Sequence, residues 1–380
     1  MGYACPEYAH ERSCWTGSMS KTPVQESVRN AQTRLMQLIT GFVGTQAVHV
    51  AAQLGIADLI AAERMTAEQL AAATGAHAAS LYRVLRYLAG ADVFHEDKLH
   101  RFSLTEAGKL LQTEGPMSVH AAALLLSSPL HWKPMGEMLY SVTTGKDAFH
   151  QVYRQSYFEH TAQHPEDAKS FNAWMTRSSQ MQIPAILASY DFSGCRKIID
   201  VGGGQGALLA GILSANPGTT GVLYDVAPVI GSAQGISGVR DRCEAVAGDF
   251  FESVPGAGDA YLLCQILHDW NDERAVRILG NCRNAMNQDG RVLLIEQVVP
   301  PGNAPHPSKV MDLSMMVMFG GRERYIEEYS DLLHAARLKL NRLVSTPSPL
   351  FIIEAVAACV SHVGKPLERP TYITASWLMR

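Results

Sequence analysis

Apolar residues in the first third of the chain recur at steps of three and four, which is the period of a helix that buries one face. The first such run comprises Ala31, Leu35, Ile39, Phe42, Val43, Ala47 and Val50. Two further helical runs, over 66–73 and 80–90, stand on either side of Gly75. Two short strand-like segments, 93–95 and 100–104, then flank a charged turn. This order of a helix, a glycine turn, a second helix and a hairpin predicts a winged-helix domain.

The pattern changes along the rest of the chain. A polar stretch over 1–22 predicts a disordered lead before the winged-helix region at 23–115, and 116–190 predicts helices throughout. Strand-like and helical runs then alternate, which is typical of a parallel sheet with crossover helices. The alternating runs are 197–201, 208–215, 220–224, 260–263, 272–285, 291–299, 328–336, 340–345 and 351–357. We therefore expect an α/β domain over 191–357 and a patternless tail over 358–380.

Composition and charge exclude several classes of protein. Of the 380 residues, 47% are hydrophobic and 18% are charged, so the chain can bury a sizeable core. Winged helices often bind DNA, but residues 23–110 hold eight Lys and Arg against eight Asp and Glu. A face that binds phosphates needs a basic excess. We therefore expect no nucleic-acid partner, and interpret the apolar first helix as a contact between two copies in a homodimer.

Cysteine use and hydropathy bear on location. The seven cysteines are scattered and contain no CxxC pair, so they indicate free thiols rather than a disulfide framework or a zinc site. The notable absence of a long uninterrupted apolar run predicts no membrane span, and residues 1–22 lack the apolar centre of a secretion signal. These features predict a cytoplasmic protein.

A glycine loop follows the first predicted strand of the α/β domain. Asp200 precedes Gly202 and Gly204, and a helix follows Gly206. Glycines there let a ligand approach the start of the helix, as in dinucleotide-binding proteins. Asp225 ends the next strand, where it can accept the hydroxyls of a ribose. In the segment 248–251, the carboxylate of Asp249 can hydrogen-bond the amino group of an adenine, and the aromatic ring that follows it can stack on the adenine. Asp200 favours a cationic cofactor over a pyrophosphate.

Several ordered motifs over residues 25–357 resemble the O-methyltransferases of the caffeate and antibiotic-tailoring type. The matching segments are 171–175 (FNAWM), 200–206 (DVGGGQG), 248–251 (GDFF), 267–270 (LHDW) with Asp272, 294–296 (LIE) and 320–324 (GGRER). The resemblance implies a Rossmann-like domain that uses S-adenosylmethionine, preceded by a winged-helix dimerisation domain. It also implies antibiotic biosynthesis or other secondary metabolism as the setting.

The resemblance assigns the cofactor site by position. The corresponding residues here are Ser179, Gly202, Gly204, Asp225, Asp249, Phe250 and Cys264. It implies that Gly202 backs the methionine part of the cofactor and Asp225 binds its ribose. Asp249 and Phe250 are expected to hold the adenine. Cys264 stands where plant members carry Lys, so its contact differs from theirs.

A histidine is the expected base. A phenol, with a pKa near 10, needs help to lose its proton at neutral pH, and a nearby imidazole can take it. His268 lies just past the strand 260–263, near the sheet edge that binds ligands in such folds. The alternative is a cap or core histidine. We expect no metal, because no set of hard oxygen ligands of the magnesium-dependent kind is evident, although such a route is the rival mechanism.

A carboxylate usually orients such a base. Glu296 and Glu323 are the candidates that the resemblance implies. Glu323 could instead pair with Arg322 or Arg324. We expect Asp269 to cap the helix 272–285 or to meet solvent.

Methionines concentrate where the acceptor should bind. They are Met175, Met311, Met315, Met316 and Met318. Methionine lines adaptable apolar slots, and with Trp132 and Phe171 it favours a flat aromatic acceptor. We assign the acceptor to Trp132, Met175, Met315 and Met318, although core packing explains at least half of the methionines.

Three other functions remain open. The same fold can methylate nitrogen, or use the cofactor without methylating, although His268 weighs against the latter. A small-molecule-sensing regulator is the third. The favoured prediction is metal-independent O-methylation of a phenolic hydroxyl.

Overall fold

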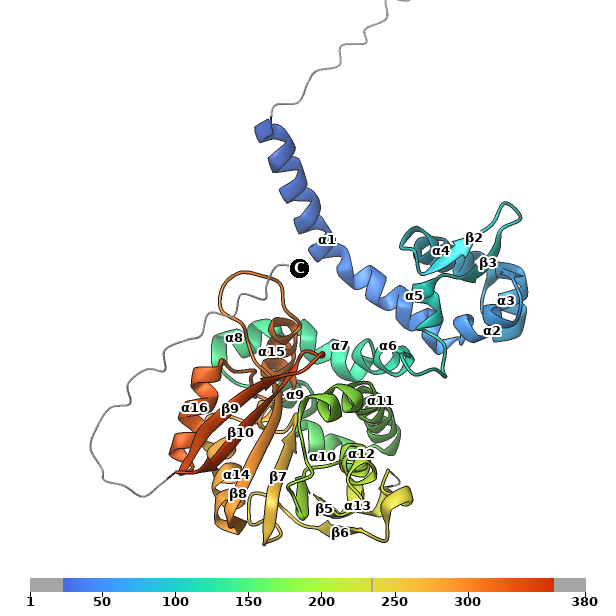
Figure 1. The fold of residues 1–380 in the computed structure, drawn as a ribbon. Coiled ribbons are helices and arrows are strands. Elements are labelled where there is room, and N and C mark those ends of the chain that lie inside the picture. Colours follow the sequence, from blue (N-terminus) through green and yellow to red (C-terminus); the bar gives the residue numbers. More distant parts are fainter. Residues whose placement is uncertain (1–22, 234, 359–380) are drawn as a thin grey trace, which may run out of the picture. The chain divides into compact units, whose positions relative to one another are not determined.

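The computed structural model describes residues 23–233 and 235–358, and the chain divides into two compact units, Met1–Thr105 and Glu106–Arg380 (Figure 1). The predicted lead at 1–22, and the predicted tail apart from residue 358, lie outside the described residues. The first unit contains α1 (Pro23–Gln53), α2 (Ile56–Ala62), β1 (Met65–Thr66), α3 (Ala67–Thr74), α4 (Ala78–Gly90), β2 (Phe94–Glu96) and β3 (Arg101–Leu104).

The first unit has the predicted winged-helix order. Thr66 caps α3 through its side chain, which accepts from the Gln69 amide, and the helix ends at Gly75, whose φ of 72° suits glycine. Strands β1, β3 and β2 form a small antiparallel sheet. Phe94 and Phe102 on that sheet are fully buried. The predicted hairpin and helix–turn–helix are therefore confirmed.

The second unit begins with helices. They are α5 (Glu106–Lys109), α6 (His120–Leu126), α7 (Pro129–Gly136), α8 (Met138–Thr144), α9 (Ala148–Tyr153), α10 (Tyr157–Gln163) and α11 (Pro165–Ser189). The stretch predicted as helical throughout is thus broken into several short helices and one long one. Ser156 and Asp147 mark two of the breaks, because each caps the helix that follows it.

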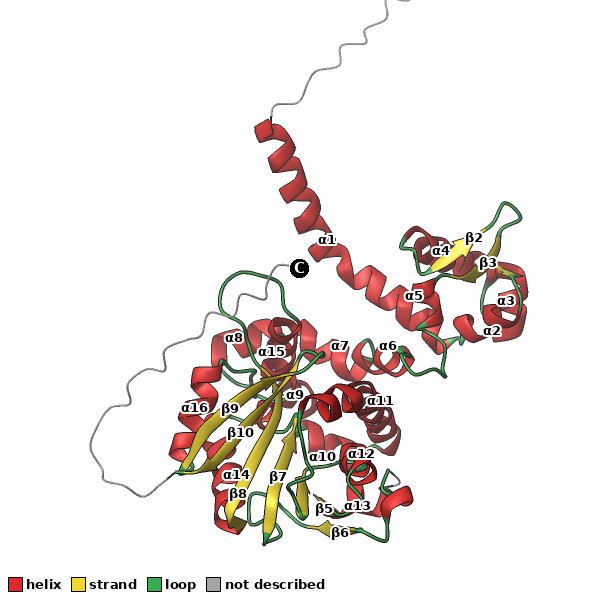
Figure 2. Ribbon diagram, in the orientation of Figure 1, coloured by secondary structure: helices red, strands yellow, loops and turns green. Residues whose placement is uncertain are grey.

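A seven-stranded sheet forms the centre of the second unit (Figure 2). Its strands are β4 (Lys197–Val201), β5 (Thr220–Asp225), β6 (Cys243–Ala247), β7 (Gly258–Cys264), β8 (Met286–Gln297), β9 (Leu338–Ser345) and β10 (Leu350–Ala357). The helices of this part are α12 (Ala207–Ala215), α13 (Ala227–Ser232), α14 (Asp272–Ala285), α15 (Pro307–Met318) and α16 (Ile326–Ala335), with short 3-10 turns at Ser237–Val239 and Leu267–Asp269. The strand order is β6-β5-β4-β7-β8-β10-β9.

The sheet topology positions the site. Strands β4 to β8 run parallel, whereas β10 is antiparallel to both β8 and β9. Apolar side chains cover both faces, as the near-continuous apolar runs predict: Ile198, Ile199 and Val201 of β4 are fully buried. The carboxyl ends of the parallel strands share one edge, so the segments that follow β4, β5, β7 and β8 come together there.

Two features of the sheet differ from the sequence prediction. A strand was expected before 248–251, but its bounds were not predicted; in strand β6 two adjacent residues, Glu244 and Ala245, are exposed, so the apolar alternation is weak. This strand is an edge of the sheet, where polar residues are tolerated. Strand β8 begins at Met286, several residues before the predicted 291.

Candidate active site

The glycine loop after β4 is shaped by steric exclusion. Gly202, Gly204 and Gly206 have positive φ, which disfavours other residues there. A Cβ on Gly203 would lie 2.6 Å from the Asp200 carboxyl carbon, and one on Gly202 would lie 2.6 Å from Ile266. Helix α12 starts directly after this loop. The loop is therefore a cradle of bare backbone at the carboxyl edge of the sheet.

Two carboxylates adjoin this cradle. Asp225 accepts hydrogen bonds from the amides of Gly204 (2.9 Å) and Val226 (2.7 Å), which fixes it at the end of β5. Asp200 is 1% exposed, and burial, with the charge of Asp225, raises its pKa to about 7. Its Oδ2 has no hydrogen-bond partner in the part of the chain that the structure describes. Such a pair suits a cationic ligand that also carries hydroxyl donors.

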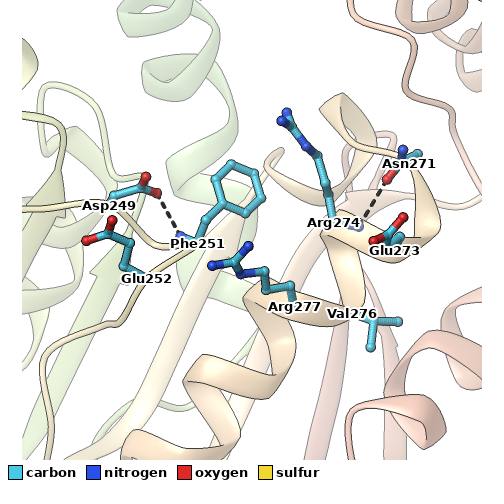
Figure 3. Close-up of a pocket in the computed structure, with 8 residues that line it drawn as sticks. All are labelled: Asp249, Phe251, Glu252, Asn271, Glu273, Arg274, Val276 and Arg277. Atoms are coloured by element: carbon cyan, nitrogen blue, oxygen red, sulfur yellow. Dashed lines mark hydrogen bonds between the residues drawn. The ribbon is translucent and has the colours of Figure 1, made fainter.

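The loop after β6 meets the cradle from another side. The Phe250 ring lies 3.5 Å from the Cβ position of Gly202, so these two predicted residues are brought together. Asp249 is exposed, and its carboxylate accepts from the Phe251 amide at 2.8 Å. Asp249 and Phe251 line a hollow of about 560 Å³, and the Arg274 guanidinium lies 5.1 Å from the Phe251 ring centre. Figure 3 shows the side chains that line this hollow.

That hollow is distinct from the cradle. Its walls are Asp249, Phe251, Glu252, Asn271, Glu273, Arg274, Val276 and Arg277 (Figure 3). Asp249 is the only one of these eight that the sequence assigned to the cofactor. The two remaining cofactor predictions, Ser179 on α11 and Cys264 at the end of β7, are partly buried. Burial and the charges of Asp200 and Glu296 raise the pKa of the Cys264 thiol well above its usual value, so it stays neutral.

The predicted base lies in a short turn after β7. His268 is 5% exposed, and its Nδ1 lies 2.9 Å from Glu323 Oε1 and 3.8 Å from Glu296 Oε2. Glu296 also holds the turn, because its Oε1 accepts from the amides of Ile266 (3.0 Å) and Leu267 (2.8 Å). The histidine and both predicted glutamates are therefore together, and all three are buried.

Asp269 is not where we expected it. Asn271, rather than Asp269, caps α14, because its side chain accepts from the Arg274 amide at 3.0 Å. Asp269 turns inward, with Oδ1 3.5 Å from His268 Nε2 and a side chain only 15% exposed. Burial raises its pKa to about 6. The prediction of a cap or solvent-facing acid is thus wrong, and Asp269 is a third carboxyl beside the histidine.

The charges around His268 favour its protonated form. Burial lowers the pKa of the imidazole, but the carboxyls of Glu296, Asp269 and Glu323 outweigh burial and raise that pKa to about 10. Burial, together with the charges of the neighbouring carboxylates of Glu323 and Asp269, raises the pKa of Glu296 to about 7. The site therefore stabilises an imidazolium strongly.

Arg324 organises the turn that carries His268. This arginine is fully buried and donates to the carbonyls of Leu267 (2.9 Å) and Trp270 (2.8 Å) and to Asp272 Oδ1 (2.9 Å). Arg322 donates to the other oxygen of Asp272 at 2.7 Å. Neither Arg322 nor Arg324 forms an ion pair with Glu323, so the alternative prediction of a Glu323–arginine pair is wrong. The sequence analysis did not predict that Arg324 holds this turn, because buried arginines are rare.

The predicted acceptor residues fall in different environments. Met315 and Met318 of α15 are buried, Met175 of α11 is partly buried, and Trp132 of α7 is 36% exposed. Met318 belongs to a core cluster that also contains Phe149 and Tyr157. Core packing therefore accounts for Met318 in the absence of a ligand.

Aromatic rings that the sequence did not single out lie beside the histidine turn. Phe158 stacks on Trp270 with ring centres 5.9 Å apart, and lies 5.6 Å from Phe319. Phe171, which the sequence did single out, lies 6.5 Å from Phe158. Phe158, Trp270 and Phe319 thus form an apolar layer beside the turn that carries His268, and Phe171 meets Phe158 edge-on at 79°.

A parallel sheet whose carboxyl edge joins a glycine cradle, two acids and a buried histidine defines the Rossmann-like methyltransferases. Comparison with known families narrows this class. Residues 135–338 match the O-methyltransferase domain, and residues 36–114 match the O-methyltransferase dimerisation domain. The chain belongs to this O-methyltransferase family, whose members use S-adenosylmethionine.

Individual relatives agree with this assignment. The chain is 41% identical to phenazine O-methyltransferase PhzM of Lysobacter antibioticus, over 84% of this chain and 95% of that protein. It is 34% identical to phenazine-1-carboxylate N-methyltransferase of Pseudomonas aeruginosa, over 86% and 98%. A crystal structure of an O-methyltransferase (NcsB1) from neocarzinostatin biosynthesis, in complex with S-adenosylmethionine and 2-hydroxy-5-methyl naphthoic acid, superposes with a TM-score of 0.73. It has 33% identity and covers 83% of this chain and 96% of that one.

Proposed function

We propose that this enzyme methylates a phenolic hydroxyl of a small aromatic secondary metabolite, with His268 as general base and without a metal. The buried hydrogen bond between His268 Nδ1 and Glu323 carries the proposal. In the neutral imidazole it assigns the ring proton to Nδ1 and leaves Nε2 to accept a proton from the substrate, so catalysis requires the fraction of His268 that is deprotonated. Relatives named for phenazine and hydroxynaphthoate substrates support an aromatic acceptor.

The residues of the cradle fit the cofactor. Asp225 is held at the end of β5, where it could accept ribose hydroxyls, and the bare backbone at Gly202 and Gly203 leaves room for close approach. One oxygen of Asp200 has no hydrogen-bond partner among residues 23–233 and 235–358. Ser179, Asp249, Phe250 and Cys264 stay as proposed contacts. When bound, S-adenosylmethionine supplies the methyl group on a positively charged sulfur.

The base and its neighbours would act in sequence. Glu296 fixes the turn through two backbone amides, so the imidazole is held in place before the acceptor arrives. His268 Nε2 takes the phenolic proton as the oxygen attacks, and the charges of Glu323, Glu296 and Asp269 stabilise the resulting imidazolium. The layer of Phe158, Trp270 and Phe319 would pack against the aromatic ring of the acceptor.

A metal is the rival role for the same cluster. The ligand atoms of His268, Glu296 and Glu323 lie within 4.8 Å of one another. We favour a proton-transfer role, because the 2.9 Å separation of Nδ1 and Glu323 Oε1 is that of a hydrogen bond. One oxygen of Glu296 is moreover occupied by two amides.

The proposal is tested with labelled S-adenosylmethionine and a panel of phenols, catechols, hydroxyquinones and aromatic amines, each with EDTA or with added Mg²⁺. We expect label in an O-methyl product with at least one of these acceptors, and the same rate under both conditions. Loss of transfer in EDTA with recovery in Mg²⁺ would contradict the metal-free mechanism. Label on a nitrogen of amine-bearing acceptors alone would favour N-methylation, the activity named for one relative.

The apolar face of α1 points to a homodimer. Leu35, Leu38, Ile39 and Phe42 are each more than half exposed. By length and mean hydropathy alone, Ser27–Gln53 could also span a membrane, and only 17% of its most apolar stretch is buried. We propose that this face packs on a second copy, because the match to the dimerisation domain begins at residue 36, within α1. The relatives are biosynthetic enzymes, so we place the protein in the cytoplasm.

A further inference from the structure

Two neighbouring side chains near the aromatic layer each have a buried polar atom without a hydrogen-bond partner in the described part of the chain. Tyr157, the first residue of α10, is 1% exposed, and its hydroxyl has no hydrogen-bond partner within residues 23–233 and 235–358. The same holds, over those residues, for Nδ1 of His131 on α7. The two rings pack at 66° with centres 5.7 Å apart. A buried polar atom without a partner is costly, so the pair points to a ligand.

The position of Tyr157 relates this pair to the proposed reaction. Its ring centre lies 5.3 Å from Phe171 and 4.9 Å from Phe319. The next residue, Phe158, stacks on Trp270, two positions after His268. The Tyr157 hydroxyl is also close enough to Asp269 to be affected by its charge. Tyr157 therefore stands one ring away from the turn that carries the base.

The chemistry of the pair selects its partner. Burial, with the charges of Asp167 and Asp269, raises the pKa of Tyr157 far above its usual value, so the hydroxyl stays neutral and can donate. Burial lowers the pKa of His131 to about 4, so its imidazole is also neutral near pH 7. Asp167, held by His160 at 2.9 Å, and Asp269 both repel an anion. A neutral oxygen is favoured over a carboxylate.

We propose that Tyr157 donates a hydrogen bond to a neutral carbonyl oxygen of the acceptor, with His131 as a second polar contact. The substrate class is then a hydroxylated aromatic ketone or quinone, rather than a simple phenol or an aromatic acid. This assignment rests on the proposed function, and it makes Tyr157 a specificity residue that touches the end of the acceptor away from the methylated hydroxyl.

Two acceptors that differ only in a carbonyl test the assignment. We compare kcat/KM for 6-hydroxy-1-tetralone and for 5,6,7,8-tetrahydro-2-naphthol in the wild type and in Tyr157→Phe. The wild type should favour the ketone, and Tyr157→Phe should lower kcat/KM for the ketone about tenfold while leaving the naphthol unchanged. Tyr153→Phe is the matched control, because the Tyr153 hydroxyl donates to a backbone carbonyl, that of Pro129, at 3.1 Å. Its ratio of the two constants should equal that of the wild type.

Several outcomes would overturn the assignment. An equal loss for both acceptors in Tyr157→Phe would show that Tyr157 only supports the fold, and a lowered Tm would agree with that. A wild-type preference for 6-hydroxy-2-naphthoate over the ketone would show that the site takes an anion. If the wild type methylated none of these acceptors but bound S-adenosylhomocysteine, the proposed function itself would fail. Methylation of both tetralin compounds without preference would leave the function standing and overturn only the role of Tyr157.

Discussion

Three carboxyl groups surround the imidazole of His268, two near Nδ1 and one near Nε2. The two ring nitrogens therefore have different surroundings. Glu323 Oε1 lies 2.9 Å from Nδ1, whereas Asp269 Oδ1 lies 3.5 Å from Nε2. In the proposed mechanism, the hydrogen bond to Glu323 orients the imidazole and Nε2 is the nitrogen that would take the proton of the acceptor.

Replacement of His268 by alanine separates chemistry from binding. We expect His268→Ala to lower kcat by about 10²- to 10⁴-fold, which is the usual contribution of a general base. Binding of S-adenosylhomocysteine, measured by calorimetry, should be unchanged, because the cradle lies after a different strand. Lost cofactor binding with retained turnover would contradict the assignment.

Replacement of Glu296 by glutamine tests the electrostatic argument. The charge of Glu296 helps to raise the pKa of His268, so its removal should lower that pKa by about one unit. Because activity requires the deprotonated imidazole, the rise of kcat with pH should then move to lower pH by about the same amount. Glutamine keeps an oxygen for the amides of Ile266 and Leu267.

The control for this experiment is a buried glutamate elsewhere on the sheet. Glu354 of β10 is bonded to Arg342 at 2.9 Å and does not contact the histidine cluster. The pH profile of Glu354→Gln should match that of the wild type. A shift of equal size in both variants would show that the profile reports the fold rather than the base.

The residues of the cluster differed in how well the sequence could predict them. His268, Glu296 and Glu323 follow from motifs, because each ends a strand or turn at the sheet edge, and the structure brings the three together. Asp269 was misplaced, since an acid three residues before a helix also fits a cap. Asn271 is the cap instead, because it directly precedes the helix and its side chain reaches the Arg274 amide.

Among the elements, the loop between β4 and α12 has little steric freedom. A Cβ on Gly203 would lie 2.5 Å from Leu223 and 2.6 Å from the Asp200 carboxyl, both of which are buried. These contacts explain why the strand must break into glycines at this point. The sequence pattern predicted the loop correctly, but not which glycine is most constrained.

A single methyl group should therefore disturb this loop. We expect Gly203→Ala to lower the free energy of unfolding by about 1–3 kcal/mol, as overpacking does, and to weaken binding of S-adenosylhomocysteine. Thermal denaturation and calorimetry measure the two effects. Gly218→Ala is the control, since a Cβ there meets nothing within 4 Å and φ is not positive. Equal effects of the two substitutions would refute the steric explanation.

Helices and strands with strong periodicity were predicted well, and the exceptions have physical causes. The prediction for α14 matches its bounds, because caps and a clear apolar face define it. The bounds of strand β6 could not be predicted, because an edge strand has only one neighbour and tolerates polar residues. Helix α15 begins with Pro307 after a loop rich in proline, which obscured its start.

At the level of the whole molecule, the exposed face of α1 is the feature that an isolated chain does not explain. Leu38 is 76% exposed and Phe42, one turn later, is 56% exposed. Such a continuous apolar face in water favours association with a second copy. The sequence predicted this face from its period alone, but could not show that the rest of the unit leaves it uncovered.

Light scattering tests this association. The wild type should have about twice the chain mass of 41.4 kDa, and Leu38→Glu should shift the protein toward 41.4 kDa, because a buried charge opposes the contact. Gln37→Glu adds the same charge at the adjacent position and should leave the mass unchanged. A wild type that scatters as a single chain would contradict the homodimer.

If the glycine cradle holds the cofactor as proposed, the buried oxygen of Asp200, which has no hydrogen-bond partner among the described residues, makes cofactor binding depend on pH. With a pKa of about 7, this carboxyl carries a proton in roughly half of the ligand-free molecules at neutral pH. The positive charge of S-adenosylmethionine favours the ionised form of Asp200, so its binding should release part of a proton to the solution. The affinity for S-adenosylmethionine should therefore increase as the pH rises. The heat of loading should consequently depend on which buffer absorbs that proton. S-adenosylhomocysteine lacks the sulfonium charge, so its binding should release less of a proton, and it should dissociate more readily than S-adenosylmethionine.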